Sequence, residues 1–475
     1  MQTTLNRTIT LALAAALLGA CAAVGPNYTG APAVADNAVK ARHFARDNAS
    51  DVTAPLAANW WQTLDDATLN SLIEQALKDS PNLHAAEARL RASRASLSQQ
   101  EAKGRPSGSV STLGLGLWQA PGTDESTSSH LYSLGFDATW ELDLFGGTRR
   151  TVESASAQAQ AVQADLADAQ VSLAAEVAQA YLQLRAQQRS LALLQDSARL
   201  DGQALTLTWQ RFDHGVATAD EVEQRKAQGE STQASIADLR AQLTASLDRL
   251  ALLTGEAPGT LDATLNTNAA QLPSLAATVQ VGDPATLLQR RPDIRAAERR
   301  LAASNAQIGV QEANYFPKVT LLGDIGFAGT SVGKLTNTNS NSLALIAVPY
   351  LSWNVLDFGR TASAVRQANA NRDEALANYQ SAVLGALQDA NTSLARYGQQ
   401  RQVVQRLLAQ QTSTGNRLAL EGQRRHAGVA SELDLLDAQR NDIDARMKAL
   451  DGEASLLQDF VALQKSLGLG WRVEA

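Results

Sequence analysis

Residues 81–106 read PNLHAAEARLRASRASLSQQEAKGRP, and residues 292–317 read PDIRAAERRLAASNAQIGVQEANYFP. Thirteen of these 26 aligned positions are identical, at a constant offset of 211 residues. Further along the chain the offset becomes 213, so that Trp140 corresponds to Trp353 and Gly215 to Gly428. A repeat of about 210 residues is a duplicated structural unit rather than a short solenoid repeat. The sequence therefore predicts that each half builds the same arrangement.

The bulk composition favours long helices over a large aromatic core. Aromatic residues make up only 5% of the 475 residues, and alanine and glutamine are plentiful. Helices that pack through small side chains need little aromatic volume. The net charge of −7 and the isoelectric point of about 5.4 argue against a nucleic-acid partner.

The N-terminus has the pattern of an export signal followed by a cysteine. The apolar run Ile9–Leu18 is too short to span a bilayer as a helix but fits the hydrophobic core of a signal peptide over residues 1–20. Cys21, the one cysteine of the chain, follows Leu18-Gly19-Ala20 in the manner of a bacterial lipobox. An ordinary signal peptide with a chance cysteine is the alternative. Ala22 after the cysteine indicates sorting of a lipoprotein to the outer membrane, and no later segment has the pattern of a membrane-spanning helix.

Each half contains a predicted β-hairpin with alternating polar and apolar residues. Residues 131–141 alternate cleanly and follow a shorter alternating stretch across the polar loop 119–130, so a hairpin is predicted over about 107–142. The second half repeats it over about 318–355, with blurrier alternation. Such strands resemble transmembrane β-strands, but soluble amphipathic hairpins share the pattern.

A very long helix is predicted after each hairpin. From Val152 to Leu184 small and apolar residues recur every three or four positions, which is heptad spacing with one stutter, within a predicted helix from Arg149 to Phe212. This segment corresponds to roughly 96 Å of helix, too long for one globular domain. It needs partner helices to cover its seam. A fibrous coiled coil is an alternative, although a fibre has no need of two strand pairs.

Each long helix is predicted to end in a tight turn followed by a returning helix. Gly215 and Gly428 suit left-handed caps, and the returning helices run to about Thr254 and Leu467. Residues 255–283, rich in Pro, Gly and Thr, link the halves. Each half is therefore helix, hairpin, long helix, turn and helix.

Several specific motifs together resemble the outer-membrane factor family, the TolC-like channels, and within it the lipoprotein efflux branch of NodT type. The resemblance covers essentially the whole mature chain. The motifs are Cys21 with Val24-Gly25-Pro26-Asn27-Tyr28, Trp60-Trp61, Trp140-Glu141-Leu142-Asp143-Leu144-Phe145-Gly146, Gln289-Arg290-Arg291-Pro292-Asp293-Ile294-Arg295, Tyr315-Phe316-Pro317, and Trp353 with Asp357-Phe358-Gly359-Arg360.

The resemblance implies a mainly α fold with membrane β-structure, built from two tandem repeats. Long coiled helices would form a periplasmic α-barrel, and a homotrimer would share a transmembrane β-barrel to which each chain gives four strands. The predicted strands independently support a barrel shared between copies, because four strands cannot close a membrane barrel and an open edge is not tolerated in lipid. From the sequence alone, either two or three copies could close the barrel.

We expect the chain to divide at the boundaries of these elements. The expected parts are a signal peptide over 1–20, a lipid-anchored tether over 21–64, a first repeat over 65–254 with its turn at 213–218, a linker over 255–283, a second repeat over 284–468 with its turn at 426–431, and a tail over 469–475.

The resemblance also implies roles for the two turns. Asp434 and Asp437 match the aspartates that line the periplasmic constriction of such channels, where acidic rings favour cations and hold a gate. The simpler interpretation is that they are solvated carboxylates near a helix N-terminus. The turn residues resemble docking tips for a periplasmic adaptor, or they simply cap helices: Gly215, Val216, Ala217, Thr218, Gly428, Val429, Ala430 and Ser431.

The predicted function is that of an outer-membrane channel in a tripartite efflux system, not an enzyme. The implied partners are a homotrimer, a periplasmic adaptor, an inner-membrane efflux pump and outer-membrane lipid. The sequence holds no catalytic motif, and we expect no cofactor and no metal. An exit duct for type I protein secretion and a pore-free periplasmic coiled-coil protein are the alternatives.

Overall fold

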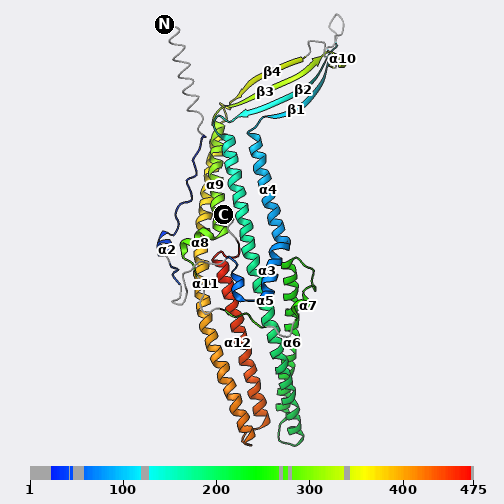
Figure 1. Cartoon of the computed structure of the whole chain (residues 1–475), viewed down its shortest axis with the longest axis vertical. Coiled ribbons are helices and arrows are strands. Elements are labelled where there is room, and N and C mark those ends of the chain that lie inside the picture. The colour runs from blue at the N-terminus through cyan, green and yellow to red at the C-terminus, as the bar shows by residue number, and fades with distance from the viewer. Residues whose placement is uncertain are drawn as a thin grey trace. The chain divides into compact units, whose positions relative to one another are not determined.

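The computed structural model describes residues 23–41, 43–46, 58–118, 128–266, 271–275, 281–335 and 343–471. These residues form long helices and one four-stranded sheet (Figure 1). The chain divides into two compact units. Unit 1 combines Arg89–Gln163 and Ala296–Gln380 with the N-terminal residues through Pro32, and unit 2 contains the remainder.

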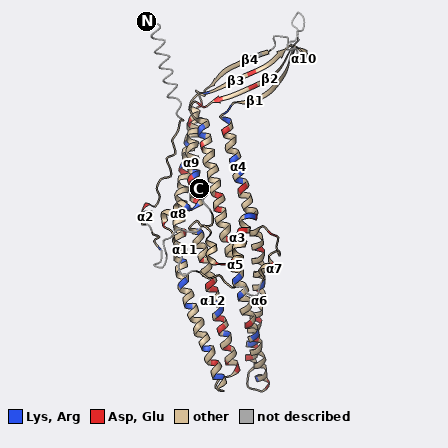
Figure 2. Ribbon diagram, viewed as in Figure 1, with Lys and Arg blue, Asp and Glu red and all other residues tan. Residues whose placement is uncertain are grey.

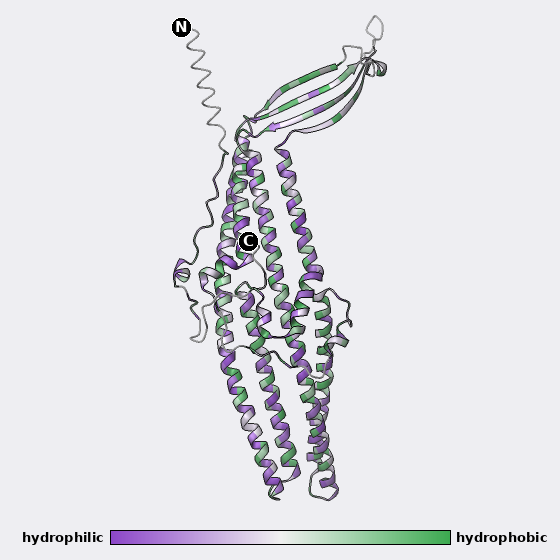
Figure 3. Cartoon of the chain, in the orientation of Figure 1, coloured by the Kyte–Doolittle hydropathy of each residue, from purple (hydrophilic) through white to green (hydrophobic). Residues whose placement is uncertain are grey.

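The sheet lies in unit 1 and is antiparallel, with the strand order β1-β2-β3-β4. Both hairpins predicted from the alternation are present. Between them, β2 of the first repeat pairs with β3 of the second, placing Trp140 opposite Leu321. Many hydrophobic residues lie along the strands (Figure 3) and stay exposed in the single chain. The strands are β1 (Ser107–Trp118), β2 (Ser128–Leu142), β3 (Lys318–Gly329) and β4 (Leu343–Ser352).

The two long helices, α5 (Gly147–Asp213) and α11 (Arg360–His426), have 67 residues each. The C-terminal part of the predicted seam of α5 is buried, at Leu173, Val177 and Leu184. The returning helices α6 (Ala219–Thr254) and α12 (Glu432–Ser466) end close to the predicted residues. The other helices are α2 (Asp36–Lys40), η1 (Trp60–Leu64), α3 (Ala67–Asp79), α4 (Pro81–Lys103), α7 (Asp262–Leu265), α8 (Pro284–Arg290), α9 (Pro292–Glu312), η2 (Ala313–Tyr315) and α10 (Val332–Leu335).

The repeat is also visible in how the returning helices end, within unit 2. Gly255 after α6 and Gly468 after α12 have φ of +78° and +71°. A Cβ at Gly255 would lie 2.4 Å from the carbonyl oxygen of Asp79, and one at Gly468 would lie 2.8 Å from Cγ of Arg291. Glycine is needed at both sites because the backbone is left-handed and another segment of the same chain packs closely against it.

In unit 1 the described N-terminal residues are held firmly. The Arg150 side chain, only 4% exposed, donates to the carbonyl oxygens of Val24 and Gly25 at 2.9 and 3.0 Å and to Oδ1 of Asn27 at 2.7 Å. The Val24 amide donates to the Phe145 carbonyl at 3.0 Å. The segment predicted as a tether therefore begins, from Ala23, as a docked strap rather than a free linker.

Within the described ranges, no helix has both the length and the apolar character needed to cross a membrane.

Candidate functional site

The two turns that follow the long helices have the same backbone geometry. Gly215 and Gly428 have φ of +70° and +72°. The Val216 amide donates to the Arg211 carbonyl at 2.8 Å, and the Val429 amide donates to the Arg424 carbonyl at 2.9 Å. These 6→1 bonds satisfy carbonyls that the helix end leaves without a partner, as a left-handed glycine cap does.

The returning helices begin differently after these turns. At the first turn, Oγ1 of Thr218 accepts a hydrogen bond from the Glu221 amide at 3.2 Å. At the second turn, Ser431 and Asp434 form a complete capping box. Oγ of Ser431 accepts from the Asp434 amide at 3.1 Å, and the Asp434 carboxylate accepts from the Ser431 amide at 2.8 Å and from its hydroxyl at 2.7 Å. The hydrogen bonds from Ser431 lower the pKa of Asp434 below its ordinary value.

Asp437 makes a different contact from Asp434, although both lie on α12. Its carboxylate accepts two hydrogen bonds from the Arg225 guanidinium on α6, at 2.6 and 2.9 Å. The Arg225 side chain is 31% exposed and that of Asp437 45% exposed. The hydrogen bonds with Asp437, followed by the charge of that carboxylate, raise the pKa of Arg225 despite its partial burial. This bidentate pair joins the two helical hairpins next to their turns.

A second polar link lies deeper along the same helices. Asp201 on α5 is 8% exposed and accepts a hydrogen bond from Thr232 of α6 at 2.6 Å. Nε of Arg440, on α12, lies 3.4 Å from the other Asp201 oxygen. Because the buried carboxylate has partners on both sides, it ties three helices together without an unpaired charge.

Apolar packing supports these links. Leu200 and Ala204 of α5 form a buried cluster with Leu433, Leu436 and Ile443 of α12. The apolar positions of α12 therefore face α5, while Asp437 lies beside α6. The valines of both turns are open, since Val216 and Val429 are each 65% exposed.

The sequence identified the turns and the two aspartates but missed Arg225. Arg225 and Asp437 lie 212 residues apart, and the residue equivalent to Arg225 in the second repeat is Ala438. The pair therefore occurs once, and comparison of the two repeats does not reveal it. The expectation that Asp434 and Asp437 share one face remains compatible with α12, but their side chains have different partners.

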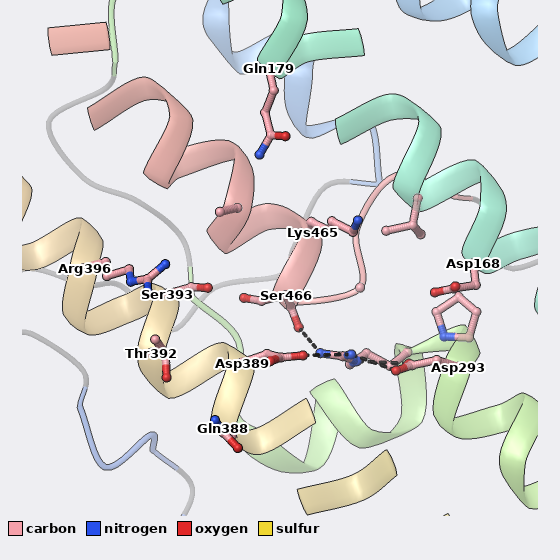
Figure 4. Close-up of a pocket in the computed structure, with 15 residues that line it drawn as sticks. Asp168, Gln179, Asp293, Gln388, Asp389, Thr392, Ser393, Arg396, Lys465 and Ser466 are labelled. Atoms are coloured by element: carbon pink, nitrogen blue, oxygen red, sulfur yellow. Dashed lines mark hydrogen bonds and ion pairs between the residues drawn. The ribbon is translucent and has the colours of Figure 1, made fainter. Parts of the chain in front are cut away.

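The motif around Arg291 forms a polar junction in unit 2, shown in Figure 4. Arg291 donates to both Asp293 oxygens at 3.0 and 2.7 Å and to the Ser466 carbonyl at 3.0 Å, and it lies 3.4 Å from Asp389. Burial lowers the pKa of Arg291, but the hydrogen bond with Asp293 and the two carboxylate charges outweigh it, so the pKa is raised. Burial raises the pKa of the nearby Asp168. These groups line a cavity of about 400 Å³, and their pairing indicates a structural junction.

Two other expectations concern chemistry at single sites. Cys21, the expected lipidation site, lies outside the described residues. Among the described residues, no group of three or more His, Cys, Asp or Glu side chains is placed to hold a metal ion.

Charged residues of both signs are distributed along the helices (Figure 2).

Comparison with known proteins places both repeats in one family. A family model described as outer membrane efflux protein matches residues 72–256 and 284–469. The antibiotic efflux pump outer membrane protein ArpC of Pseudomonas putida is 30% identical over 474 residues, covering 98% of this chain and 95% of ArpC. Nodulation protein T of Rhizobium leguminosarum bv. trifolii is 31% identical, covering 90% of this chain and 89% of its own length.

Solved structures agree in fold. The outer-membrane channel OprN is 35% identical, with a TM-score of 0.82 over 94% of this chain and 99% of OprN. The open state of the MtrE outer membrane channel of Neisseria gonorrhoeae is 26% identical, with a TM-score of 0.81 over 94% of this chain and 98% of MtrE.

Proposed function

The chain belongs to the outer membrane efflux protein family, and we propose that it is the outer-membrane channel subunit of a tripartite efflux system. The observation that carries this proposal is the full-length likeness to efflux channels, in a chain whose two repeats each supply a hairpin and a long helix pair. The channel would conduct small molecules passively, while an inner-membrane pump supplies the energy. A periplasmic adaptor would join the two.

The working assembly is a homotrimer. The single chain gives four strands, and membrane barrels have at least about eight. Other copies must therefore complete the sheet, since an open strand edge is not tolerated in lipid. The exposed apolar residues along β1 and β4 suit this role.

We also propose lipid anchoring at Cys21 after removal of residues 1–20. The support is the docked strap, which begins two residues after this cysteine. Arg150 and the Phe145 carbonyl hold Val24 close to the end of β2. A lipid attached at Cys21 would therefore be held near the foot of the sheet, where it meets the periplasmic face of the outer membrane.

The periplasmic gate is proposed at the second turn. Asp437 and Arg225 form its closing contact, because their pair joins α12 to α6 beside the turns. Asp434 has a second role as a helix cap. In a trimer these carboxylates would repeat three times around the axis and favour cations.

The two turns are proposed as docking tips for the adaptor. Both turns have the same backbone conformation and an exposed valine, so a trimer would offer six similar tips.

The remaining boundaries proposed for the chain are the repeats over 65–254 and 284–468, the linker over 255–283 and the tail over 469–475.

Planar-bilayer recording of the purified protein tests the proposed function. We expect stepwise single-channel currents. The parent channel should be closed most of the time and cation-selective when open. Asp437→Ala should increase the open fraction, whereas Asp434→Ala should leave it closer to the parent value. A protein that forms no pores in bilayers while remaining folded would overturn the channel assignment.

A further inference from the structure

Two equivalent segments connect the sheet to the long helices at the foot of the sheet. Residues 140–147 lead from β2 into α5, and residues 353–360 lead from β4 into α11, at the offset of 213 residues. We call them the first foot and the second foot. Nε1 of Trp140 donates to the Gly104 carbonyl at 3.0 Å, and Nε1 of Trp353 donates to the Tyr315 carbonyl at 2.9 Å. Both segments therefore begin on the same frame.

The first foot is covered by other parts of the same chain. Phe145 stacks on Phe316, with ring centroids 4.6 Å apart, and its carbonyl accepts a hydrogen bond from the Val24 amide of the strap. A Cβ at Gly146 would lie 2.4 Å from Cβ of Ala23, so the strap packs directly on this turn. The strap and the stacked ring therefore cover the first foot.

The equivalent positions of the second foot are open in the single chain. Val355, Leu356 and Phe358 are 76%, 78% and 92% exposed. Phe358 has a φ of +53°, a left-handed conformation that is rare for a bulky residue, whereas its equivalent Phe145 is not left-handed. A Cβ at Gly359 would meet no atom of another described segment within 4 Å. The backbone therefore turns apolar side chains outward where the described chain does not cover them.

Two cations flank this apolar turn. Lys318, the first residue of β3, lies opposite Ser352 at the end of β4, and Arg360 is the first residue of α11. Both residues are exposed, and within the described ranges neither forms an ion pair. The equivalent positions of the first repeat hold Ser107 and Gly147. Neither cation therefore has a counterpart at the covered foot.

We propose that the second foot binds an anionic phospholipid of the leaflet that faces the periplasm, an assignment that rests on the proposed outer-membrane channel. Lys318 and Arg360 hold the phosphate headgroup, and the exposed apolar turn lies against the acyl chains. Contiguous exposed apolar residues mark an interaction site. A partner that is apolar at one end and negatively charged at the other complements this surface.

The neighbouring residues indicate that this surface lies at a membrane boundary. Strand β4 carries exposed apolar residues on one face, with Leu345 77% and Leu351 61% exposed. Trp353 follows this strand, and tryptophans are typical of the boundary between lipid and water. Lysines and arginines near an anionic lipid surface are attracted to it, and a guanidinium can bind a phosphate through two parallel hydrogen bonds. The phosphate of a lipid headgroup is the anion expected at this level.

Native mass spectrometry of the purified full chain with added lipid tests the site. The probes are phosphatidylglycerol, which is anionic, phosphatidylcholine, which is zwitterionic, and glycerol 3-phosphate, which has the phosphate without acyl chains. We expect phosphatidylglycerol to be retained best. Lys318→Gln and Arg360→Gln should each weaken its retention about 5-fold, and the double variant about 30-fold. Arg366→Gln is the matched control, because it removes an exposed arginine further along α11, and it should bind like the parent.

The outcomes separate the lipid site from the proposed function. Equal retention of phosphatidylcholine, or unchanged retention in the double variant, would overturn the lipid site. Retention of glycerol 3-phosphate as strong as that of phosphatidylglycerol would show a site for free phosphate instead. Lys318→Arg with Arg360→Lys keeps both charges and should bind like the parent. Planar-bilayer recording tests the channel independently, since pores without any lipid preference would refute the site and leave the channel assignment standing.

Leu356→Gln tests the apolar half of the site. Leu356 lies at the position of Asp143 in the first foot, so the repeat accepts a polar residue there. The variant should retain phosphatidylglycerol more weakly, while the proposed trimer keeps its dissociation temperature on gels. A lower dissociation temperature with unchanged lipid retention would show that this turn contacts another copy, and the proposal would then be wrong.

Discussion

At Gly215 and at Gly428 the chain leaves a 67-residue helix through the same left-handed turn, with φ of +70° and +72°. The residues after the turns differ. The first turn leads to a single cap bond at Thr218, while the second leads to a capping box at Ser431 and then to Asp437, which pairs with Arg225. The duplication therefore kept the backbone of the turn and changed the charged contact beside it. The proposed gate is therefore a property of one repeat, completed by a single arginine of the other.

Removal of Arg225 is expected to have the largest effect, because it deletes the charged contact that the second turn has and the first lacks. Each exposed ion pair is worth ~0.2–1 kcal/mol after solvent screening, so three copies contribute ~0.6–3 kcal/mol to the closed state. Arg225→Ala should then raise the open-to-closed ratio in planar bilayers about 3- to 150-fold. Lys226→Ala is the matched control, because Lys226 pairs with Glu223 on its own helix at 3.7 Å. Equal gating changes in both variants would contradict a specific role for Arg225.

Substitutions of the two turn glycines should have equal effects on the two turns. Neither has another atom close to an added Cβ, so an alanine would meet only the left-handed backbone strain, about 1–2 kcal/mol. Gly215→Ala and Gly428→Ala should lower local stability by similar amounts, measured by hydrogen exchange of the flanking amides. A difference of more than about 1 kcal/mol between them would show that the turns are not equivalent.

The caps should respond unequally. Loss of an N-cap hydroxyl costs about 1 kcal/mol. Ser431→Ala removes two hydrogen bonds, the one that Oγ accepts from the Asp434 amide and the one that it donates to the Asp434 carboxylate, whereas Thr218→Ala removes one longer bond. Hydrogen exchange should therefore accelerate more in the first turn of α12 than in that of α6. The reverse order would argue against a stronger cap in the second repeat.

The smallest expected effect is a pH dependence at the second turn. The pKa of Asp434 is lower in the folded protein than the usual carboxyl value near 4. Its stabilising effect is therefore complete above that usual value and is lost as the pH falls through the lowered folded pKa. Protection of the α12 N-terminus should decrease below about pH 4, and Asp434→Asn should remove the dependence. An unchanged pH profile in this variant would mean that another group titrates there.

The sequence could predict the elements of the fold because their signals are local or repeated. The β-alternation, the long uninterrupted helices and the glycine of each turn appear twice, so the two halves of the chain support the same interpretation. Contacts that occur once have no such signal. Arg150, which holds the strap, corresponds to Ser363 in the other repeat, just as Arg225 corresponds to Ala438. Pairing between residues more than a hundred positions apart depends on helix rotation and register, which spacing alone does not determine.

The same reasoning explains the result for the two candidate aspartates. The sequence shows their spacing of three residues on α12, but it does not show the partner of Asp437. Asp434 follows Ser431 at the distance of a capping box, which is a local pattern. The proposed role of Asp437 depends on its ion pair with Arg225, a residue on a different helix of the other repeat.

A charge exchange between Arg225 and Asp437 tests whether this ion pair holds the channel closed. Open probability in planar bilayers would be compared for the parent protein, Arg225→Asp, Asp437→Arg and the double variant. We expect each single variant to open the channel by placing like charges together, and the double variant to return toward the closed parent because the pair is restored with reversed polarity. Single variants that gate like the parent, or a double variant as open as the sum of both, would show that the Arg225–Asp437 pair does not hold the channel closed.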